Sequence, residues 1–158
     1  MQKFFIMLII SFGTITGHAQ ELIIVSFQEF EKVLSTAPEK PKLINFWATW
    51  CKPCVEELPY FSAVQQLNDH NLEFVFVSLD FMSQTSKVKE LIQKLSLTGT
   101  LIQLNATGGD WIDAFDKNWS GAIPYTVLLL PNGEKREHYD AFNNLDDLKL
   151  FIDKNLIN

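Results

Sequence analysis

The sequence predicts an α/β fold with a mixed central sheet and helices on both of its faces. Apolar runs rich in β-branched and aromatic residues at 42–48 and 72–79 alternate with segments in which apolar residues recur at helical spacing. Later in the chain, Pro131-Asn132-Gly133 separates two further strand-like segments and indicates a hairpin. Strands connected through helices pair in parallel, whereas a hairpin adds an antiparallel pair, so the two features together indicate a mixed sheet.

Local signals place the individual elements. Ser26 followed by Glu29 has the spacing of a capping box, which marks the start of the first helix. Pro59 falls inside the second helix, where we expect it to bend the axis because it removes one backbone hydrogen bond. The two central strands are expected to lie parallel to each other. In chain order we expect strands over 21–25, 42–48, 72–79, 101–104, 123–130 and 134–141, and helices over 26–35, 51–68, 84–95, 110–119 and 145–156.

Composition narrows the class of protein. The chain has 158 residues, of which 47% are hydrophobic and 13% aromatic, enough for one compact domain with a core of its own. Its formal net charge of −6 makes nucleic acid and anionic lipid poor partners. The sequence therefore favours an acidic domain that binds no nucleic acid.

The first 19 residues have the pattern of a cleaved export signal. Lys3 precedes a nearly continuous apolar run at 4–12, and Gly17-His18-Ala19 offers small residues where a signal peptidase cuts. The run is about half as long as a membrane span, so we expect cleavage after Ala19, with an uncleaved membrane anchor as the alternative. Loss of Lys3 would take the charge of the mature domain, residues 20–158, from −6 to −7. Export also places the cysteines where disulfides persist.

The only two cysteines of the chain mark the junction between the first central strand and the helix after it. Cys51 falls at the helix N-terminus, where unpaired N–H groups stabilise an anion and lower the pKa of a thiol. Cys54 lies one turn further on, where it can attack a mixed disulfide formed on Cys51. The Cys-Lys-Pro-Cys motif therefore predicts a redox-active pair in which Cys51 attacks and Cys54 resolves.

A structural disulfide and half of a zinc site are the alternatives for this pair. The loop that such a disulfide closes is so short that the expected stabilisation is about 2 kcal/mol, at the low end for disulfides. Zinc needs four ligands, and the other candidates in the body of the chain are His70 and His138, neither of which is paired with the cysteines in sequence. We therefore expect no metal here.

Pro124 belongs to a second motif, in which the small-residue turn Gly121-Ala122 leads through Ile123-Pro124 into a late strand. Physical chemistry alone gives little reason to expect a cis bond there, because only about 5–6% of X–Pro bonds are cis. Together with Trp-Cys-x-Pro-Cys after an apolar strand and a proline five residues past the second cysteine, this turn resembles the thioredoxin superfamily over essentially the whole mature chain. The resemblance is strongest to its exported TlpA/ResA-like branch, and it implies a thioredoxin fold.

The resemblance also implies where a substrate binds. Cys51 and Cys54 match the redox pair of the family, and Pro124 matches a cis proline packed beside the pair, where substrate backbone docks. Trp50 and Ile123 are expected to contact the substrate with Pro124, although a tryptophan is as well suited to packing in the core or at its rim.

A proton-handling role for Glu57 follows from the same resemblance. Glu57 matches a buried acidic residue of this branch that is thought to handle protons for the cysteines, and the alternative is a solvated carboxylate beside Glu56. Asn45 stands where cytosolic thioredoxins carry a buried aspartate, a departure common in this branch, and Glu57 would take over the role of that aspartate.

We therefore expect an extracytoplasmic thiol–disulfide oxidoreductase that reduces disulfides of partner proteins and needs no cofactor. A disulfide-forming oxidant is the nearest alternative, because Lys52 between the cysteines would favour the thiolate and stabilise the reduced form. A Cu(I)-handling protein is another, since two thiolates suit Cu(I), whereas a peroxidase is disfavoured because the chain has no third cysteine. A reduced dithiol outside the cytoplasm also requires an unidentified electron donor, for which a membrane redox protein is a candidate.

Overall fold

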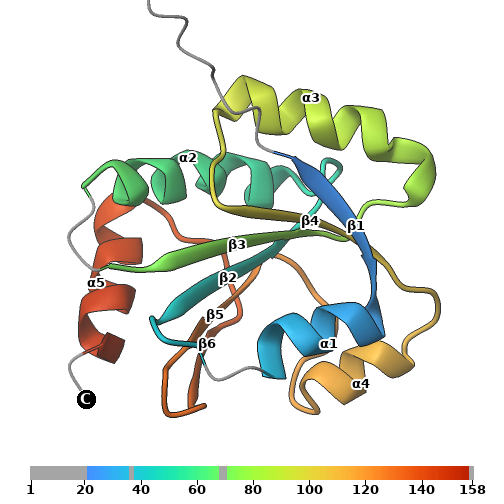
Figure 1. Ribbon diagram of the computed structural model, residues 1–158. Coiled ribbons are helices and arrows are strands. Elements are labelled where there is room, and N and C mark those ends of the chain that lie inside the picture. The colour runs from blue at the N-terminus through green and yellow to red at the C-terminus, as the bar shows by residue number, and fades with distance from the viewer. Residues whose placement is uncertain (1–20, 36–37, 68–70, 157–158) are drawn as a thin grey trace, which may run out of the picture.

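The computed structural model describes residues 21–35, 38–67 and 71–156. Six strands form one mixed sheet in the order β1-β4-β3-β2-β5-β6, as Figure 1 shows. The export signal expected at 1–19 lies outside the described residues. The strands are β1 (Leu22–Ser26), β2 (Lys42–Trp47), β3 (Glu73–Ser78), β4 (Thr100–Asn105), β5 (Tyr125–Leu129) and β6 (Lys135–His138), and the helices are α1 (Phe27–Ser35), α2 (Lys52–Leu67), η1 (Met82–Gln84), α3 (Thr85–Leu95), α4 (Asp110–Phe115) and α5 (Leu145–Leu156).

The strand pairing confirms the mixed sheet. β1, β4, β3 and β2 run parallel to one another, and Asn45 of β2 lies opposite Phe76 of β3. β5 is antiparallel to β2 and places Thr126 opposite Asn45, and β6 completes the expected hairpin. The start of β5 therefore lies at the edge of the sheet where β2 and β3 end.

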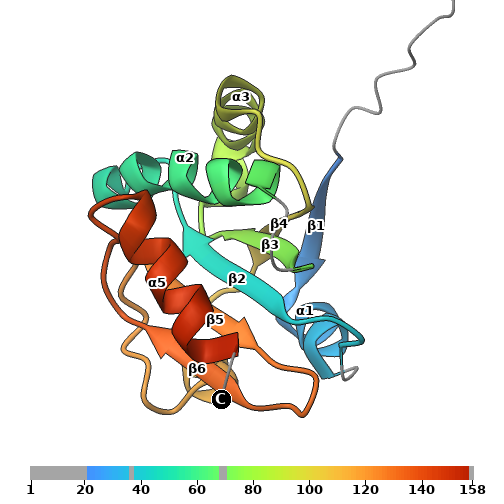
Figure 2. The ribbon, with the colours of Figure 1, turned by 90° about the vertical axis from the view of Figure 1, so that its left-hand side faces the viewer.

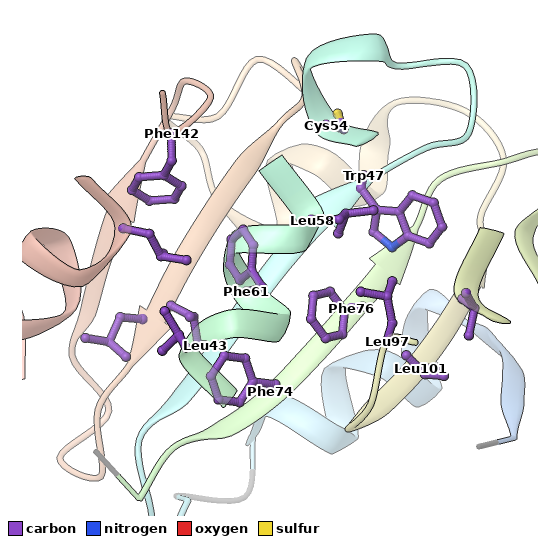
Figure 3. Close-up of a cluster of buried hydrophobic side chains, with 14 of the residues drawn as sticks. Leu43, Trp47, Cys54, Leu58, Phe61, Phe74, Phe76, Leu97, Leu101 and Phe142 are labelled. Atoms are coloured by element: carbon purple, nitrogen blue, oxygen red, sulfur yellow. The ribbon is translucent and has the colours of Figure 1, made fainter. Parts of the chain in front are cut away.

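Two apolar layers fill the space between the sheet and its helices. Alternate residues of β2 point to opposite faces, so Leu43 belongs to one layer and Ile44 to the other. Residues of α2, α3 and α5 pack in the first layer and residues of α1 and α4 in the second. Figure 1 shows α2 and α3 across the sheet from α1 and α4, and Figure 2 shows the same separation of α2 and α3 from α1. In Figure 3, Phe61 of α2 lies over the sheet, and its ring meets that of Phe76 edge to face, with 5.9 Å between centroids. This packing fixes α2 against the central strands.

α2 runs through Pro59 to Leu67. Pro59 lies on the exposed side of the helix. The bend expected at Pro59 stays a prediction.

The helix predicted over 110–119 is shorter in the structure and ends at Phe115. Asp116 is extended, with φ −157° and ψ 114°, so the helical backbone stops there. The N–H groups of Asn118 and Trp119 donate instead to the side chain and the carbonyl of Asp116, at 2.8 and 3.1 Å. A turn thus replaces the last helical turn that the sequence predicts.

The two strands of the hairpin are also shorter than predicted. β5 begins at Tyr125 instead of residue 123, so the Ile-Pro pair lies just outside the ladder. β6 ends at His138 instead of residue 141. Beyond it, the N–H of Phe142 donates to the carboxylate of Glu57 at 2.9 Å, which directs the chain toward α2.

Candidate active site

Cys51 occupies the position just before the first residue of α2. Its N–H donates to the carbonyl of Ala48 at 3.1 Å, and its carbonyl accepts the N–H of Val55 at 3.1 Å. Its Sγ lies 3.3 Å from the backbone nitrogen of Cys54, the place that a capping side chain takes at a helix N-terminus. The predicted position of the cysteine pair at a strand-to-helix junction is confirmed.

Cys51 and Cys54 are joined by a disulfide. Cys54 is fully buried and belongs to the apolar layer that also contains Trp47 and Leu58, as Figure 3 shows. Cys51 retains 6% exposure against 0% for Cys54, so it is the sulfur that a partner molecule can approach.

The Ile123-Pro124 segment lies beside Cys51. The peptide bond between the two residues is cis, as the resemblance implied. The carbonyl oxygen of Ile123 lies 3.7 Å from Sγ of Cys51, and the turn before it is held by the indole N–H of Trp119, which donates to Ala122 at 2.7 Å. Pro124 is buried and Ile123 half-buried. The structure thus brings Cys51 and Ile123 together from positions 72 residues apart.

The four tryptophans divide into packing and surface residues. Trp47 and Trp119 are buried in opposite layers of the core, and Trp111 packs partly buried against Trp119. Trp50 is 63% exposed and immediately precedes Cys51. Of the four, Trp50 is therefore the one placed to meet a partner at the reacting sulfur.

Glu57 is buried, with 1% of its surface exposed, which overturns the alternative of a solvated carboxylate. One carboxylate oxygen accepts from Nδ2 of Asn45 at 2.8 Å, and the other accepts from the N–H of Phe142 at 2.9 Å. Nδ2 of Asn45 also donates to Oγ1 of Thr126 at 3.0 Å. We call Glu57, Asn45, Thr126 and the Phe142 N–H the Glu57 cluster.

Burial raises the pKa of Glu57 to about 7, even though the hydrogen bonds from Phe142 and Asn45 favour the ionised form. Nearby Asp140 raises the pKa further. Glu57 follows Cys54 by one turn of α2, so the two side chains share a face of the helix. A carboxyl group with this pKa can gain or lose a proton near neutral pH.

A second buried carboxylate, Asp80, lies two residues past the end of β3. Its oxygens accept from the N–H of Thr49 at 2.9 Å, the hydroxyl of Thr49 at 2.5 Å and the hydroxyl of Ser78 at 2.9 Å. Asp80 is 1% exposed. We call Asp80, Thr49 and Ser78 the Asp80 cluster, which ties the end of β3 to the turn that carries Cys51.

Sequence reasoning missed the Asp80 cluster and the Asn45–Thr126 pair. Thr49 and Asp80 each follow a strand of the predicted parallel pair at the same distance, which is a signal that could have brought them together. The Asn45–Thr126 pair depends on the register of β5 against β2, for which the sequence has no local marker.

His138 is the one histidine among the residues that the structure describes. His138 lies in β6 and stacks on Phe142 with 4.1 Å between ring centroids, and His70 lies outside the described residues. Within the described ranges, no group of three or more His, Cys, Asp and Glu side chains is arranged to hold a metal ion.

Known proteins are similar to this chain in sequence and in structure. Residues 28–141 match the Redoxin family. The chain is 32% identical over 120 residues to thiol-disulfide oxidoreductase ResA of Oceanobacillus iheyensis, covering 75% of this chain and 59% of that protein. It is 24% identical over 140 residues to ResA of Geobacillus kaustophilus, covering 85% and 74%. A solved thiol:disulfide interchange protein of Chlorobium tepidum superposes with a TM-score of 0.62 at 21% identity, covering 76% of this chain and 82% of that one.

The predicted thioredoxin fold and the resemblance to the ResA-like branch of the thioredoxin superfamily are both confirmed. The chain spans about three fifths of the Oceanobacillus protein and about three quarters of the Geobacillus protein.

Proposed function

The chain belongs to the Redoxin family, and we propose that it is a thiol–disulfide oxidoreductase that reduces disulfides of partner proteins outside the cytoplasm. One observation carries the proposal: Cys51, linked to Cys54, caps α2 with its sulfur 3.7 Å from the Ile123 carbonyl. The helix N-terminus stabilises a thiolate on the accessible sulfur, and the Ile123-Pro124 segment gives a substrate backbone a place beside it. The ResA relatives are named thiol-disulfide oxidoreductases, which agrees with thiol–disulfide exchange at this site.

The reaction follows from the positions of the two sulfurs. The Cys51 thiolate attacks one sulfur of a partner's disulfide, forms a mixed disulfide and releases the first partner thiolate. The Cys54 thiolate then attacks Sγ of Cys51, which restores the Cys51–Cys54 disulfide and releases the second. Two electrons pass to the partner, and each released thiolate takes up a proton.

Glu57 is proposed to accept the proton that the Cys54 thiol must lose before it attacks. Cys54 is fully buried, so water has little access to that thiol. Glu57 lies one turn away on the same helix face, and its pKa of about 7 suits proton exchange at neutral pH. In the opposite direction the protonated carboxyl returns the proton to Cys54.

The charges around the pair support the reducing direction. An oxidant is favoured when the reduced thiolate form is stabilised. Lys52 is exposed and its Nζ lies 3.5 Å from a carboxylate oxygen of Glu56, so its positive charge is offset by a neighbouring negative charge. An ionised Glu57 close to Cys54 disfavours a thiolate there. The ion pair offsets the stabilisation that Lys52 would give to a thiolate, and the ionised Glu57 opposes the stabilisation that the helix N-terminus gives, so both effects favour the dithiol as an electron donor.

Export and an external electron donor complete the proposal. Residues 1–19 supply the expected signal, and the persistence of disulfides outside the cytoplasm means that a donor dithiol must return electrons to Cys51 and Cys54. In the part of the chain that the structure describes, no helix has the length and apolar character needed to cross a bilayer.

Trapping of the mixed disulfide tests this proposal. Cys54→Ser lacks the resolving sulfur, so the exported variant is expected to accumulate partner proteins bound to Cys51. Cys51→Ser keeps only the buried sulfur and is expected to trap far fewer. Non-reducing gels of the two variants from the source cells, with mass spectrometry of the adducts, would identify the partners.

Two results would contradict the proposal. Adducts mainly on Cys51→Ser would reverse the roles of the sulfurs. Reductant-sensitive adducts on neither variant, together with stoichiometric copper held by the reduced wild-type protein against a chelator, would favour the Cu(I)-handling alternative.

A further inference from the structure

Two strongly exposed aromatic side chains flank the Asp80 cluster. Trp50 follows Thr49 and is 63% exposed, and Phe81 follows Asp80 and is 78% exposed. A single exposed apolar residue needs no explanation. Trp50 and Phe81 differ from such isolated residues in two ways. The residues that precede them, Thr49 and Asp80, are hydrogen-bonded to each other, and Trp50 is the neighbour of Cys51 in the sequence.

Hydrogen bonds with two buried side chains hold the backbone beside both residues in place. The Asp80 carboxylate accepts from the N–H and the hydroxyl of Thr49, at 2.9 and 2.5 Å, and so fixes the residue before Trp50. The side chain of Gln103 donates to the carbonyls of Asp80 and Phe81, at 3.2 and 3.1 Å. Because the backbone is already ordered, a partner that packs on these rings loses less conformational entropy in the protein than it would on a mobile loop.

Trp50 connects this cluster to the reacting sulfur. It lies in the turn from Ala48 to Cys51, which the hydrogen bond from the Cys51 N–H to the Ala48 carbonyl closes at 3.1 Å. The carbonyl of Ile123 approaches the Cys51 sulfur at 3.7 Å. Direct contacts and peptide bonds therefore connect Phe81 through Asp80 and Thr49 to Trp50, and Trp50 through Cys51 to Ile123.

We propose that Trp50 and Phe81 form an apolar docking surface for the polypeptide segment that flanks the reactive disulfide of a partner protein. The surface selects partners that carry an aromatic or large aliphatic residue near the attacked cysteine. This inference rests on the proposed function, since a disulfide attacked by Cys51 brings its flanking residues onto the surface around that sulfur. A polypeptide is the occupant because only a chain joined to the attacked sulfur must lie there, and the acidic chain disfavours anionic lipid.

A pair of peptide disulfides tests the surface. The two probes have identical lengths and disulfide loops, with Trp and Leu beside the cysteines in one and Ser in the other. Pre-reduced protein is mixed with increasing excess of each probe, and quenched samples give the half-saturation concentration and the limiting rate of a single turnover. Phe81→Ser and Trp50→Ser are compared with Leu150→Ser, which removes a 66% exposed apolar residue from α5.

We expect the wild-type protein to favour the apolar peptide. Phe81→Ser and Trp50→Ser are each expected to reduce that preference about tenfold, the scale of one apolar side chain left unburied, mainly through the half-saturation concentration. Leu150→Ser is expected to keep the wild-type preference. Circular dichroism of each variant verifies that these surface substitutions leave the fold intact.

An unchanged preference in Phe81→Ser would overturn the inference, even if Trp50→Ser reduced it, because the surface would then not include Phe81. An equal loss in Leu150→Ser would also overturn it. Wild-type protein that reduces neither peptide would instead contradict the proposed function, and the inference with it.

Discussion

Two carboxylates with the same burial lie close to the cysteine pair in sequence or in space, and they differ in their hydrogen bonds. Glu57 and Asp80 are each 1% exposed. Asp80 accepts three hydrogen bonds, two of them from Thr49, whereas Glu57 accepts two, from Asn45 and Phe142. Burial of a charge is costly unless hydrogen bonds compensate it, so the number and placement of these donors decide what each group can do.

The carboxylates of Asp80 and Glu57 therefore have different roles. The donors to Asp80 come from the turn before Cys51 and from the end of β3, so removal of the carboxylate disconnects two segments of the site. At Glu57 desolvation outweighs the two hydrogen bonds and raises the pKa to about 7, which leaves the group able to change its protonation near neutral pH. Asp80 thus positions the backbone, and Glu57 is suited to proton transfer.

The largest expected effect follows from removal of the Asp80 carboxylate. Asp80→Ala leaves the N–H and hydroxyl of Thr49 and the hydroxyl of Ser78 without their acceptor inside the protein. We expect the free energy of unfolding of the oxidised protein to fall by about 4 kcal/mol, in the range for breaking a buried charged network. Urea unfolding at pH 7 measures the loss.

The control for this change is Asp113→Ala, which removes an exposed carboxylate from α4. It is expected to alter the free energy of unfolding by less than about 0.5 kcal/mol. A loss below about 1 kcal/mol in Asp80→Ala would contradict the positioning role, because it would mean that water replaces the carboxylate without penalty.

The second prediction concerns the pH dependence of stability. Because the pKa of Glu57 rises from 4.5 in the unfolded chain to about 7 in the folded protein, the folded state binds more protons between these values. This stabilising contribution is complete below pH 4.5 and is lost as the pH rises through 7. Relative to Glu57→Gln, the free energy of unfolding of the wild-type protein should therefore fall by about 3 kcal/mol between pH 4 and pH 8. Urea unfolding of both oxidised proteins across this range measures it.

Glu56→Gln is the matched control, since Glu56 is the exposed neighbour of Glu57 in sequence. Its stability should follow the wild-type curve over the same pH range. Glu57→Gln is also expected to slow the resolving step about 100-fold, within the usual range for loss of a general base, whereas Glu56→Gln is not. A wild-type curve parallel to that of Glu57→Gln would place the pKa of Glu57 near its ordinary value and remove the basis of the proton-transfer role.

The sequence was sufficient for features whose causes are local. The apolar run at 42–48 and the helical spacing after it place the strand, the helix and the cysteines between them, because each depends on neighbours within a few residues. The hairpin at Pro131-Asn132-Gly133 was predictable for the same reason. The cis bond before Pro124 came from the family resemblance, since proline chemistry alone gives it a low frequency.

Other features depend on residues far apart in the chain. The insertion of β4 between β1 and β3 follows from packing of the whole sheet. The hydrogen bond from the Phe142 N–H to Glu57, in the segment after β6, joins residues 85 positions apart. Trp47 and Trp50 have similar neighbours in the sequence. Trp47 ends β2 and is buried, whereas Trp50 lies in the turn that follows and is exposed.

The prediction with the smallest expected effect concerns the contribution of one hydrogen bond to the pKa of Glu57. Nδ2 of Asn45 donates to Glu57 at 2.8 Å and favours the ionised form, so Asn45→Leu should raise the pKa of Glu57 above 7 by about one unit, the equivalent of one hydrogen bond to a charged group. Carbon-13 NMR of the labelled Glu57 carboxyl in the oxidised protein measures this pKa directly. Thr126→Val is the control, because it removes only the other acceptor of Asn45 and leaves the bond to Glu57 in place; its Glu57 pKa should match the wild-type value. If Asn45→Leu left the pKa unchanged or lowered it, desolvation and the Phe142 N–H would account for the titration alone, and the Glu57 cluster would lose Asn45 as a contributor to its chemistry.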